Sequence, residues 1–288
     1  PEGNFSPSSI ERAKEVLDCC QPYLASKRDK GAAPFIVGIS EITNEGQDSY
    51  NLQIIIEQPK VAYLFRKDLE NDIEFQKLYQ RVGPTKYTMT SMEKCYSLYK
   101  AIQYIVNGDI PGDIIECGVW RGGSAMLSAL TLIELEQTQR KIYLYDTYEG
   151  MPEPTEKDID IHGLPYRLIW QQEKDLLTVP LGEVKKNMFS TGYPSENLIF
   201  VKGKVENTIP RITPDQVALL RLDTDFYEST YHELVHLYPK VSPQGVILVD
   251  DYGHFQGARE GTDKYFNEFS QNILLHRIDY SCRVGIKP

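Results

Sequence analysis

Residues 113–124 read Asp-Ile-Ile-Glu-Cys-Gly-Val-Trp-Arg-Gly-Gly-Ser, and this stretch decides the fold. Its first five residues have the length and apolar content of a buried strand, and an apolar helical pattern follows at 124–136. Glycines between a strand and a helix let the backbone approach a ligand, and the free N–H groups of the helix N-terminus attract negative charge. The pattern departs from G-x-G-x-x-G because Trp120 stands where the second glycine would be. Taken alone, the stretch is either a ligand-binding turn or an ordinary turn between a strand and a helix.

The alternation of strand and helix patterns continues to the C-terminus. Further strands are expected at 141–145, 197–201, 217–222, 245–249 and 273–279. Helices are expected at 181–188, 229–238 and 259–269, with a short helical turn at 205–210. This order predicts an α/β fold with a doubly wound, mostly parallel sheet, in which ligands bind at the carboxyl ends of the strands.

The first 85 residues predict an N-terminal α+β appendage. It is expected to contain a helix at 9–20, a β-hairpin of 35–42 and 50–57, and a helix at 65–81. A helix at 87–106 then leads into the sheet. We therefore expect two domains, an appendage at 1–85 and the main α/β domain at 86–288.

Composition restricts the class of partner. The 288 residues include 31 Lys and Arg against 41 Asp and Glu, which gives a formal net charge of −10. Binders of nucleic acid or of anionic membranes need clustered positive charge, so both partners are disfavoured. No apolar run approaches the roughly 20 residues that cross a bilayer, the N-terminus lacks an export pattern, and the five cysteines lack C-x-x-C spacing. We expect a cytoplasmic protein with a small-molecule substrate, associating as a homodimer or with a neighbouring domain of a longer polypeptide.

A second motif points to an adenosine ligand. The strand at 141–145 ends at Asp146, roughly 20 residues beyond the glycines, where an acidic side chain can bind the hydroxyls of a ribose. A solvated aspartate at a strand end is the alternative. The next segment, 147–179, is long, punctuated by proline and rich in aromatic residues, so we expect it to form a lid over a site.

Four carboxylates follow two strands that are expected to be neighbours. Asp223 and Asp225 follow the strand at 217–222, and Asp250 and Asp251 follow the strand at 245–249. Like charges at close range repel, and a divalent cation among them relieves the repulsion. Oxygen ligands favour Mg²⁺, Ca²⁺ or Mn²⁺ over zinc. The alternative is that these aspartates cap a helix and shape a turn.

A competing motif predicts a zinc hydrolase. Residues 232–236 read His-Glu-Leu-Val-His and match H-E-x-x-H, with Glu260 available as a third ligand. Against this interpretation, Pro239 ends the helix soon after His236, and the helix lies in a crossover away from the strand ends. A further alternative is a module that keeps the fold and binds without catalysis.

Several long motifs resemble one family. They are Glu116–Gly123, Tyr145–Pro152, Leu220–Thr230, Leu237–Gly245 and Val249–Gly253. From about Tyr87 to the C-terminus, the chain resembles the macrocin O-methyltransferase (TylF/MycF-like) family. The resemblance implies a Rossmann-like class I methyltransferase fold and methylation of a hydroxyl, typically on a sugar of a natural product. It also implies S-adenosylmethionine as methyl donor and Mg²⁺, or Mn²⁺, as the metal.

The resemblance also implies roles for individual residues. Asp223, Asp250 and Asp251 correspond to the metal ligands, and Asp225 corresponds to the general base that deprotonates the hydroxyl. The residues expected to bind the cofactor are Thr88, Met89, Glu116, Gly118, Arg121, Gly122, Gly123, Ser124 and Asp146. One departure is Thr224, where family members often carry glycine; a β-branched residue restricts the backbone and could reposition Asp225.

Overall fold

The chain divides into two compact units, Pro1–Asp72 and Ile73–Pro288. The computed structural model describes residues 4–5, 35–44, 50–57, 67–83, 86–173, 175 and 177–288, with side chains from residue 67 onward except those of 172 and 173. The sequence predicts the division after residue 85, whereas helix α4 (Ile73–Val82) already belongs to the larger unit.

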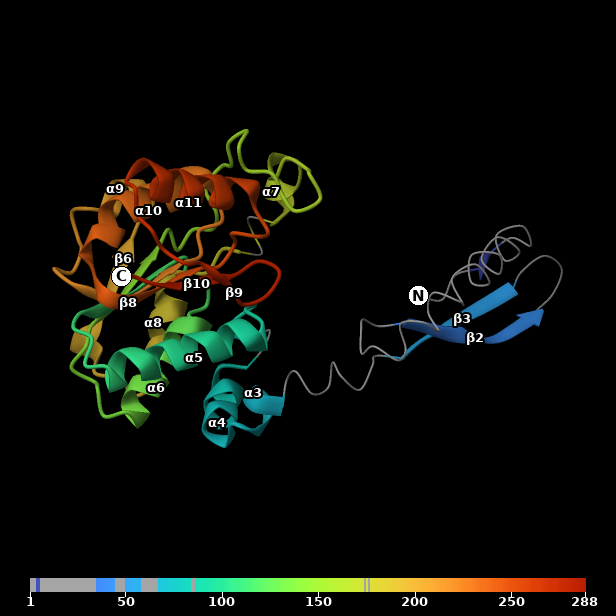
Figure 1. The fold of residues 1–288 in the computed structure, drawn as a ribbon, viewed down its shortest axis with the longest axis horizontal. Helices are drawn as coiled ribbons and strands as arrows, with labels where there is room; N and C mark the ends of the chain where they lie inside the picture. Colours follow the sequence, from blue (N-terminus) through green and yellow to red (C-terminus); the bar gives the residue numbers. More distant parts are fainter. Residues whose placement is uncertain are drawn as a thin grey trace. The chain divides into compact units, whose positions relative to one another are not determined.

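The smaller unit contains an antiparallel sheet. Strands β2 (Phe35–Asn44) and β3 (Tyr50–Glu57) pair with each other, and β1 (Asn4–Phe5) pairs with the other edge of β3 (Figure 1). The predicted hairpin is therefore confirmed. The predicted helix at 9–20 lies outside the described residues. The predicted helix at 65–81 is interrupted at Asp72, between α3 (Lys67–Asn71) and α4.

The larger unit is built on a mixed sheet that has seven strands in the part of the chain that the structure describes. The strands are β4 (Asp113–Cys117), β5 (Ile142–Asp146), β6 (Leu198–Lys202), β7 (Val217–Leu222), β8 (Val241–Val249), β9 (His276–Arg277) and β10 (Arg283–Ile286). Their order across the sheet is β6-β5-β4-β7-β8-β10-β9. The first five are parallel and β10 runs antiparallel to β8, so the predicted doubly wound, mostly parallel sheet is confirmed.

The C-terminal edge of the sheet corrects one prediction. A single strand at 273–279 is wrong, because only His276–Arg277 is extended there and it pairs with β10 rather than with a parallel neighbour. Strand β10 has four residues, one of which is glycine, so its sequence carries little strand pattern. Pairing with β8 determines its conformation instead.

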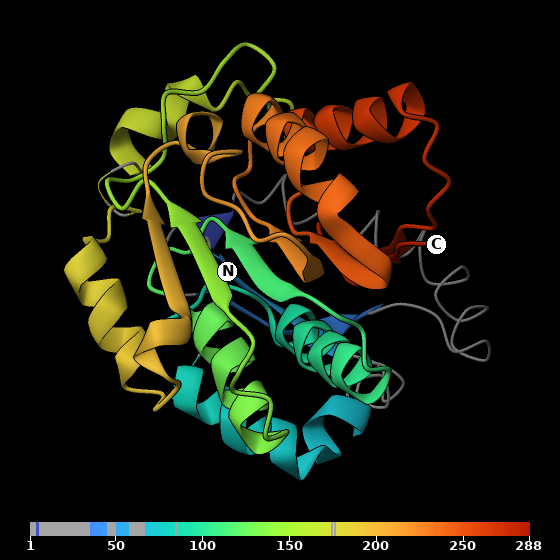
Figure 2. The same ribbon diagram turned by 90° about the vertical axis from the view of Figure 1, so that its left-hand side faces the viewer.

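Helices cover both faces of this sheet. They are α5 (Met92–Asn107), α6 (Gly123–Glu134), α7 (Arg167–Glu173), α8 (Leu181–Phe189), α9 (Val205–Thr208), α10 (Tyr227–Leu237) and α11 (Gln256–Glu268). Figures 1 and 2 show α5, α6 and α8 on one face and α10 and α11 on the other. None of the described helices has the length and apolar composition of a bilayer-spanning segment.

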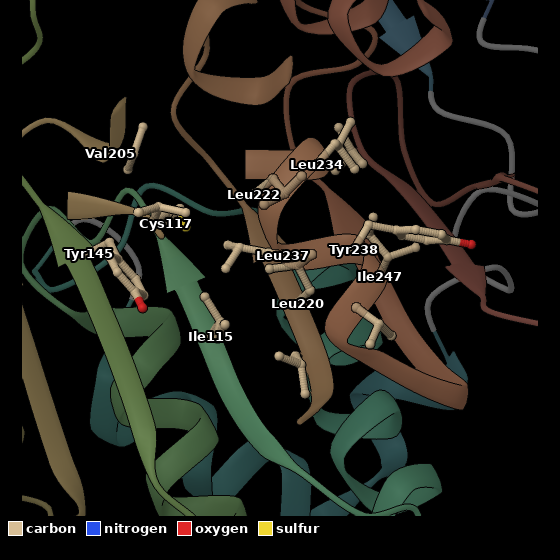
Figure 3. Close-up of a cluster of buried hydrophobic side chains, with 14 of the residues drawn as sticks. Ile115, Cys117, Tyr145, Val205, Leu220, Leu222, Leu234, Leu237, Tyr238 and Ile247 are labelled. Carbon is tan, nitrogen blue, oxygen red and sulfur yellow. The ribbon is translucent and has the colours of Figure 1, made fainter. Parts of the chain in front are cut away.

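An apolar core fixes α10 against the sheet. Leu234 and Leu237 of α10 are fully buried and lie over Leu220 of β7 and Ile247 of β8 (Figure 3). Burying an aliphatic side chain of this size contributes about 1.5–3 kcal/mol. The helix is therefore held firmly above the strand that ends in the Asp223 turn.

The order of the strands predicts where a ligand binds. Within this sheet, β4 is the first strand in the chain. The chain then adds β5 and β6 on one side of β4 and crosses over to add β7 and β8 on the other side. Loops on the two sides of β4 diverge at the carboxyl ends of the strands and leave a crevice there. The site is built at this edge.

Candidate active site

A cavity of about 550 Å³ opens at the carboxyl ends of strands β4 to β8. Every one of these strands contributes the residues that follow it. The lining includes Gly118 and Trp120 after β4, Asp146 at the end of β5 with Thr147 after it, residues 203–206 after β6, residues 223–225 after β7, and Asp250 and Asp251 after β8. The predicted convergence of strand ends is thus confirmed.

Gly118 joins the turn after β4 to the turn after β7. Its φ of +83° is unfavourable for any residue with a side chain. A Cβ at this position would also lie 1.8 Å from the backbone oxygen of Asp223. The backbone N–H of Asp223 donates to the Cys117 oxygen at 2.8 Å. Glycine is therefore required here, and its absence of a side chain lets the two turns share one wall of the cavity.

The segment at 86–90 covers the start of α6. The Gly123 N–H donates to the Tyr87 oxygen at 2.9 Å, and Arg121 Nη1 donates to the Lys86 oxygen at 3.1 Å. Thr88 is buried, while the side chain of Met89 is exposed and lines the cavity. Residues that precede β4 in the chain therefore contact the glycine turn that follows it.

Asp146 organises the backbone around the cavity. Its Oδ2 accepts hydrogen bonds from the N–H groups of Val119 at 2.7 Å and Trp120 at 3.0 Å, and its Oδ1 accepts from the Tyr148 N–H at 2.7 Å. Trp120 and Tyr148 both have positive φ, at 47° and 53°. A carboxylate that accepts several N–H groups can hold two such turns in place.

Described residues of the segment 147–179, which the sequence predicts to form a lid, contact the start of α10 and its surroundings beside the cavity. The fully buried Asp158 accepts a hydrogen bond from the Tyr227 N–H, at the start of α10, at 2.9 Å. Tyr166 packs with Phe226 and Phe255 in a small apolar cluster next to the cavity. The described part of the segment therefore forms one wall of the site.

Three of the predicted carboxylates form a cluster. Ligand atoms of Asp223, Asp225 and Asp251 lie within 4.8 Å of one another. Asp225 has a φ of +67°, a left-handed conformation that is costly for a residue other than glycine. The Oδ2 atom of Asp251 is buried and has no hydrogen-bond partner. An unsatisfied buried carboxylate oxygen beside two other carboxylates suits a bound cation.

Asp250 is held differently, by two cations. Its Oδ1 accepts from Lys94 Nζ and its Oδ2 accepts from Arg221 Nη2. The Arg221 guanidinium is buried and also donates to Asp223 Oδ2 at 2.6 Å and to Glu116 Oε1 at 2.8 Å. The guanidinium of Arg221 thus links carboxylates at the ends of three neighbouring strands, β4, β7 and β8.

Burial dominates the electrostatics of the acidic groups. Burial raises the pKa of Asp225 to about 7, although a hydrogen bond with Asp251 opposes the shift. Burial also raises the pKa of Asp223 and of Asp251 well above the ordinary value, and nearby carboxylates add to both shifts. Although burial disfavours the Lys94 ammonium, Asp250 and Asp251 raise its pKa above the ordinary value.

The structure places the predicted cofactor residues in two groups. Gly118, Asp146 and Met89 line the cavity. The remaining predicted residues lie in or around the glycine turn after β4 but do not line the cavity: Thr88, Glu116, Arg121, Gly122, Gly123 and Ser124. Glu116 is buried and accepts a hydrogen bond from the Ser124 hydroxyl, so both side chains are occupied within the protein.

The sequence-based prediction missed two basic residues of the site, Lys94 and Arg221. Lys94 lies on α5, far from the strand ends in the chain, and Arg221 lies inside an apolar strand. A buried arginine within a strand that precedes a pair of aspartates is the feature that could have identified the second of them.

The residues of the H-E-x-x-H motif do not converge on a metal site. His232 Nε2 is hydrogen-bonded to the Ile209 oxygen at 2.9 Å, and Glu260 accepts from Gln256 on the surface of α11. Glu233 points into the interior and accepts from Thr224. Among the described residues, the group suited to a metal ion is the aspartate cluster.

Comparisons with known proteins identify relatives of the chain. A family model described as Macrocin-O-methyltransferase (TylF) matches residues 48–284, so the similarity begins well before Tyr87. A tetracenomycin-C derivative 4'-O-methyltransferase from Streptomyces olivaceus is 29% identical over 215 residues, covering 75% of this chain and 81% of that protein. Demethyldecarbamoylnovobiocin O-methyltransferase from Streptomyces niveus is 30% identical over 193 residues, covering 67% and 72%.

Solved structures agree with this assignment. The O-methyltransferase NovP is similar with a TM-score of 0.65 and 26% identity, over 78% of this chain and 97% of that chain. The calicheamicin methyltransferase CalS11 shares the fold, with a TM-score of 0.57 and 18% identity over 81% and 94%. The resemblance seen in the motifs is therefore confirmed, and the chain belongs to the macrocin O-methyltransferase (TylF) family of transferases.

Proposed function

We propose that the protein transfers the methyl group of S-adenosylmethionine to a hydroxyl of a sugar-bearing natural product, with a divalent cation held by Asp223, Asp250 and Asp251. One observation carries this proposal. The cluster of Asp223, Asp225 and Asp251 shares a cavity with the glycine turn after β4 and with Asp146 after β5. A methyl donor and a site for an acceptor hydroxyl are needed side by side, and this cavity offers both.

The donor fits the half of the cavity that β4, β5 and β6 build. Gly118 lets the backbone approach a ligand, and Asp146 stands where an acidic side chain meets ribose hydroxyls. Residues 203–206, after β6, complete this half of the cavity and are the proposed surface for the adenine ring of the donor. A donor held by this half of the cavity would lie beside the carboxylates at the ends of β7 and β8.

The residues of the other half fit a hard divalent cation. Asp223, Asp250 and Asp251 are the proposed ligands, and the unpartnered Oδ2 atom of Asp251 is the observation that favours an ion. Asp250 remains available because each carboxylate oxygen has a second lone pair beside the one used by Lys94 or Arg221. When bound, Mg²⁺ or Mn²⁺ would supply Lewis acidity that favours loss of the acceptor proton.

Asp225 is the proposed general base. It lies at the cavity beside the proposed ligands and is held in a left-handed turn that directs it toward Asp251. The acceptor hydroxyl gives its proton to the Asp225 carboxylate as the oxygen attacks the methyl carbon. A C–O bond forms, the C–S bond breaks, and S-adenosylhomocysteine leaves. In-line positioning in a closed cavity supplies most of the rate.

The class of acceptor follows from the cavity and the relatives. Met151, Tyr166, Ile169 and Phe255 give the wall beside the lid an apolar and aromatic character that suits a ligand with a hydrophobic part. A relative is named for methylation of a mycinamicin at a 3'' position, and another for a rhamnosyl tetracenomycin. Sugars attached to apolar natural products are therefore the first acceptors to test.

The test is release of S-adenosylhomocysteine, measured by mass spectrometry with S-adenosylmethionine, Mg²⁺ and a panel of glycosides. We expect a methylated glycoside and an equal amount of S-adenosylhomocysteine. Calorimetry with S-adenosylhomocysteine alone tests the donor site independently of the acceptor, with one site per chain expected. Stoichiometric zinc in elemental analysis, together with no binding of S-adenosylhomocysteine, would favour the hydrolase alternative. Binding without turnover on every acceptor would favour a non-catalytic module.

A further inference from the structure

The glutamate of the H-E-x-x-H motif is hydrogen-bonded to the turn that carries two of the clustered aspartates. Glu233 lies on α10, is fully buried, and does not line the cavity. The hydroxyl of Thr224 donates to Glu233 Oε1 at 3.0 Å. Thr224 is the residue between Asp223 and Asp225, so a contact from α10 reaches the middle of the turn that carries both carboxylates.

The turn itself is held at several points. The Thr224 oxygen accepts from the Phe226 N–H at 2.8 Å and from the Ser229 hydroxyl at 3.3 Å. Asp225, directly after Thr224, has the left-handed φ of +67°. Aspartate adopts this conformation more readily than most residues other than glycine, but it remains uncommon, so contacts around the turn help to maintain it. The hydrogen bond of the Thr224 side chain is one of the contacts available for this.

Glu233 is itself fixed in place. Its neighbours Leu234 and Leu237 anchor α10 to the sheet, and the Cys117 thiol lies beside its carboxyl group at the end of β4. Its second oxygen, Oε2, is buried without a nitrogen or oxygen donor, and the Cys117 thiol beside the carboxyl group is only a weak donor. Burying a carboxyl group with so few hydrogen bonds costs stability, so packing alone gives no reason for a glutamate here.

We propose that Glu233 is a positioning residue that acts through Thr224 to hold Asp225 in its left-handed conformation and so sets the spacing of the Asp223 and Asp225 carboxylates. The proposal rests on the proposed function for the role of those two carboxylates.

The first test is Thr224→Val, which removes the hydroxyl and keeps the shape. Its control is Thr262→Val on α11, since the Thr262 hydroxyl is buried, lies outside the cavity lining and donates to the Ala258 oxygen of its own helix. Loss of a contact that orients a metal ligand typically costs about 10–100-fold in metal affinity or activity. We expect Thr224→Val to weaken Mn²⁺ binding about tenfold, measured by electron paramagnetic resonance, and to lower kcat without changing KM for S-adenosylmethionine. Thr262→Val should have the same Mn²⁺ affinity and the same kcat as wild type.

A second pair of variants tests Glu233 directly. Glu233→Gln keeps an oxygen that can accept from Thr224 and should retain Mn²⁺ affinity, whereas Glu233→Leu should reproduce the loss seen with Thr224→Val. Combining Glu233→Leu with Thr224→Val should cause no further loss, because both changes remove one interaction. Full additivity of the two losses would contradict the proposal.

Hydrogen exchange separates this proposal from the proposed function. In the ligand-free protein, amides of residues 223–227 should exchange faster in Thr224→Val than in wild type, and should be unchanged in Thr262→Val. If wild type neither binds Mn²⁺ nor transfers methyl groups, the proposed function fails, while the exchange result still decides the role of the pair. If residues 223–227 of Thr224→Val exchanged at the wild-type rate, or if the two valine variants changed exchange equally, the inference would be overturned.

Discussion

Replacement of Asp225 by asparagine is expected to lower the rate of methyl transfer about a thousandfold, since general-base catalysis typically contributes about 10²–10⁴-fold. Asparagine preserves the size of the side chain and tolerates the left-handed φ of this position, so the turn should remain intact. Because Asp225 is proposed as the base rather than as a ligand, the affinity for Mn²⁺ should stay within about twofold of wild type. Release of S-adenosylhomocysteine and Mn²⁺ titration measure the two quantities.

The matched control is Asp263→Asn, in which an exposed aspartate on α11 that accepts from the Tyr252 hydroxyl loses its charge. This variant should keep wild-type turnover. If Asp225→Asn instead lost Mn²⁺ affinity together with activity, Asp225 would be a metal ligand, as its place in the cluster with Asp223 and Asp251 also allows. Full turnover in Asp225→Asn would exclude it as the base.

Replacement of Arg221 by methionine is expected to destabilise the larger unit by about 3–5 kcal/mol near neutral pH, the usual cost of removing one partner from a buried ion pair. Methionine fills a similar volume but leaves Glu116, Asp223 and Asp250 without their shared cation. Urea unfolding measures the change. Arg259→Met is the control, since Arg259 is exposed, and it should change stability by no more than about 0.5 kcal/mol.

The deficit of Arg221→Met should grow as pH rises. Burial raises the pKa of Glu116 from 4.5 to about 7 in the folded protein, and Arg221 limits that rise. A carboxyl group with a raised folded pKa adds stability below its unfolded pKa, and this is lost as pH rises through the folded pKa. Without Arg221 the folded pKa of Glu116 rises further, so the stabilities of wild type and variant should diverge as pH rises through about 7, the folded pKa in wild type. A difference independent of pH would show that lost packing, and not lost charge, causes the effect.

Much of the parallel sheet is predictable because its signals are local. The strand at 113–117 and the glycines after it are contiguous in the chain, and so are the aspartates that follow β7 and β8. The placement of these groups at one edge follows from the rule that ligands bind at the carboxyl ends of parallel strands. Strand β10 escapes prediction because pairing with β8, and not its own four residues, makes it extended.

The internal partners of the site are not predictable in the same way. Glu116 follows the family motif, but only the structure shows it buried between Ser124 and Arg221. Lys94 reaches Asp250 from α5, 156 residues away in the chain. Such contacts depend on how the helices pack on the sheet, which no short motif encodes.

The dependence of methyl transfer on a divalent cation tests the central claim most directly. The enzyme is treated with EDTA, the chelator is removed, and release of S-adenosylhomocysteine is measured before and after Mg²⁺ or Mn²⁺ is added back. A cation held by Asp223, Asp250 and Asp251 predicts a loss of at least about a hundredfold on chelation and full recovery on addition of the ion. Turnover that EDTA leaves unchanged would contradict the claim.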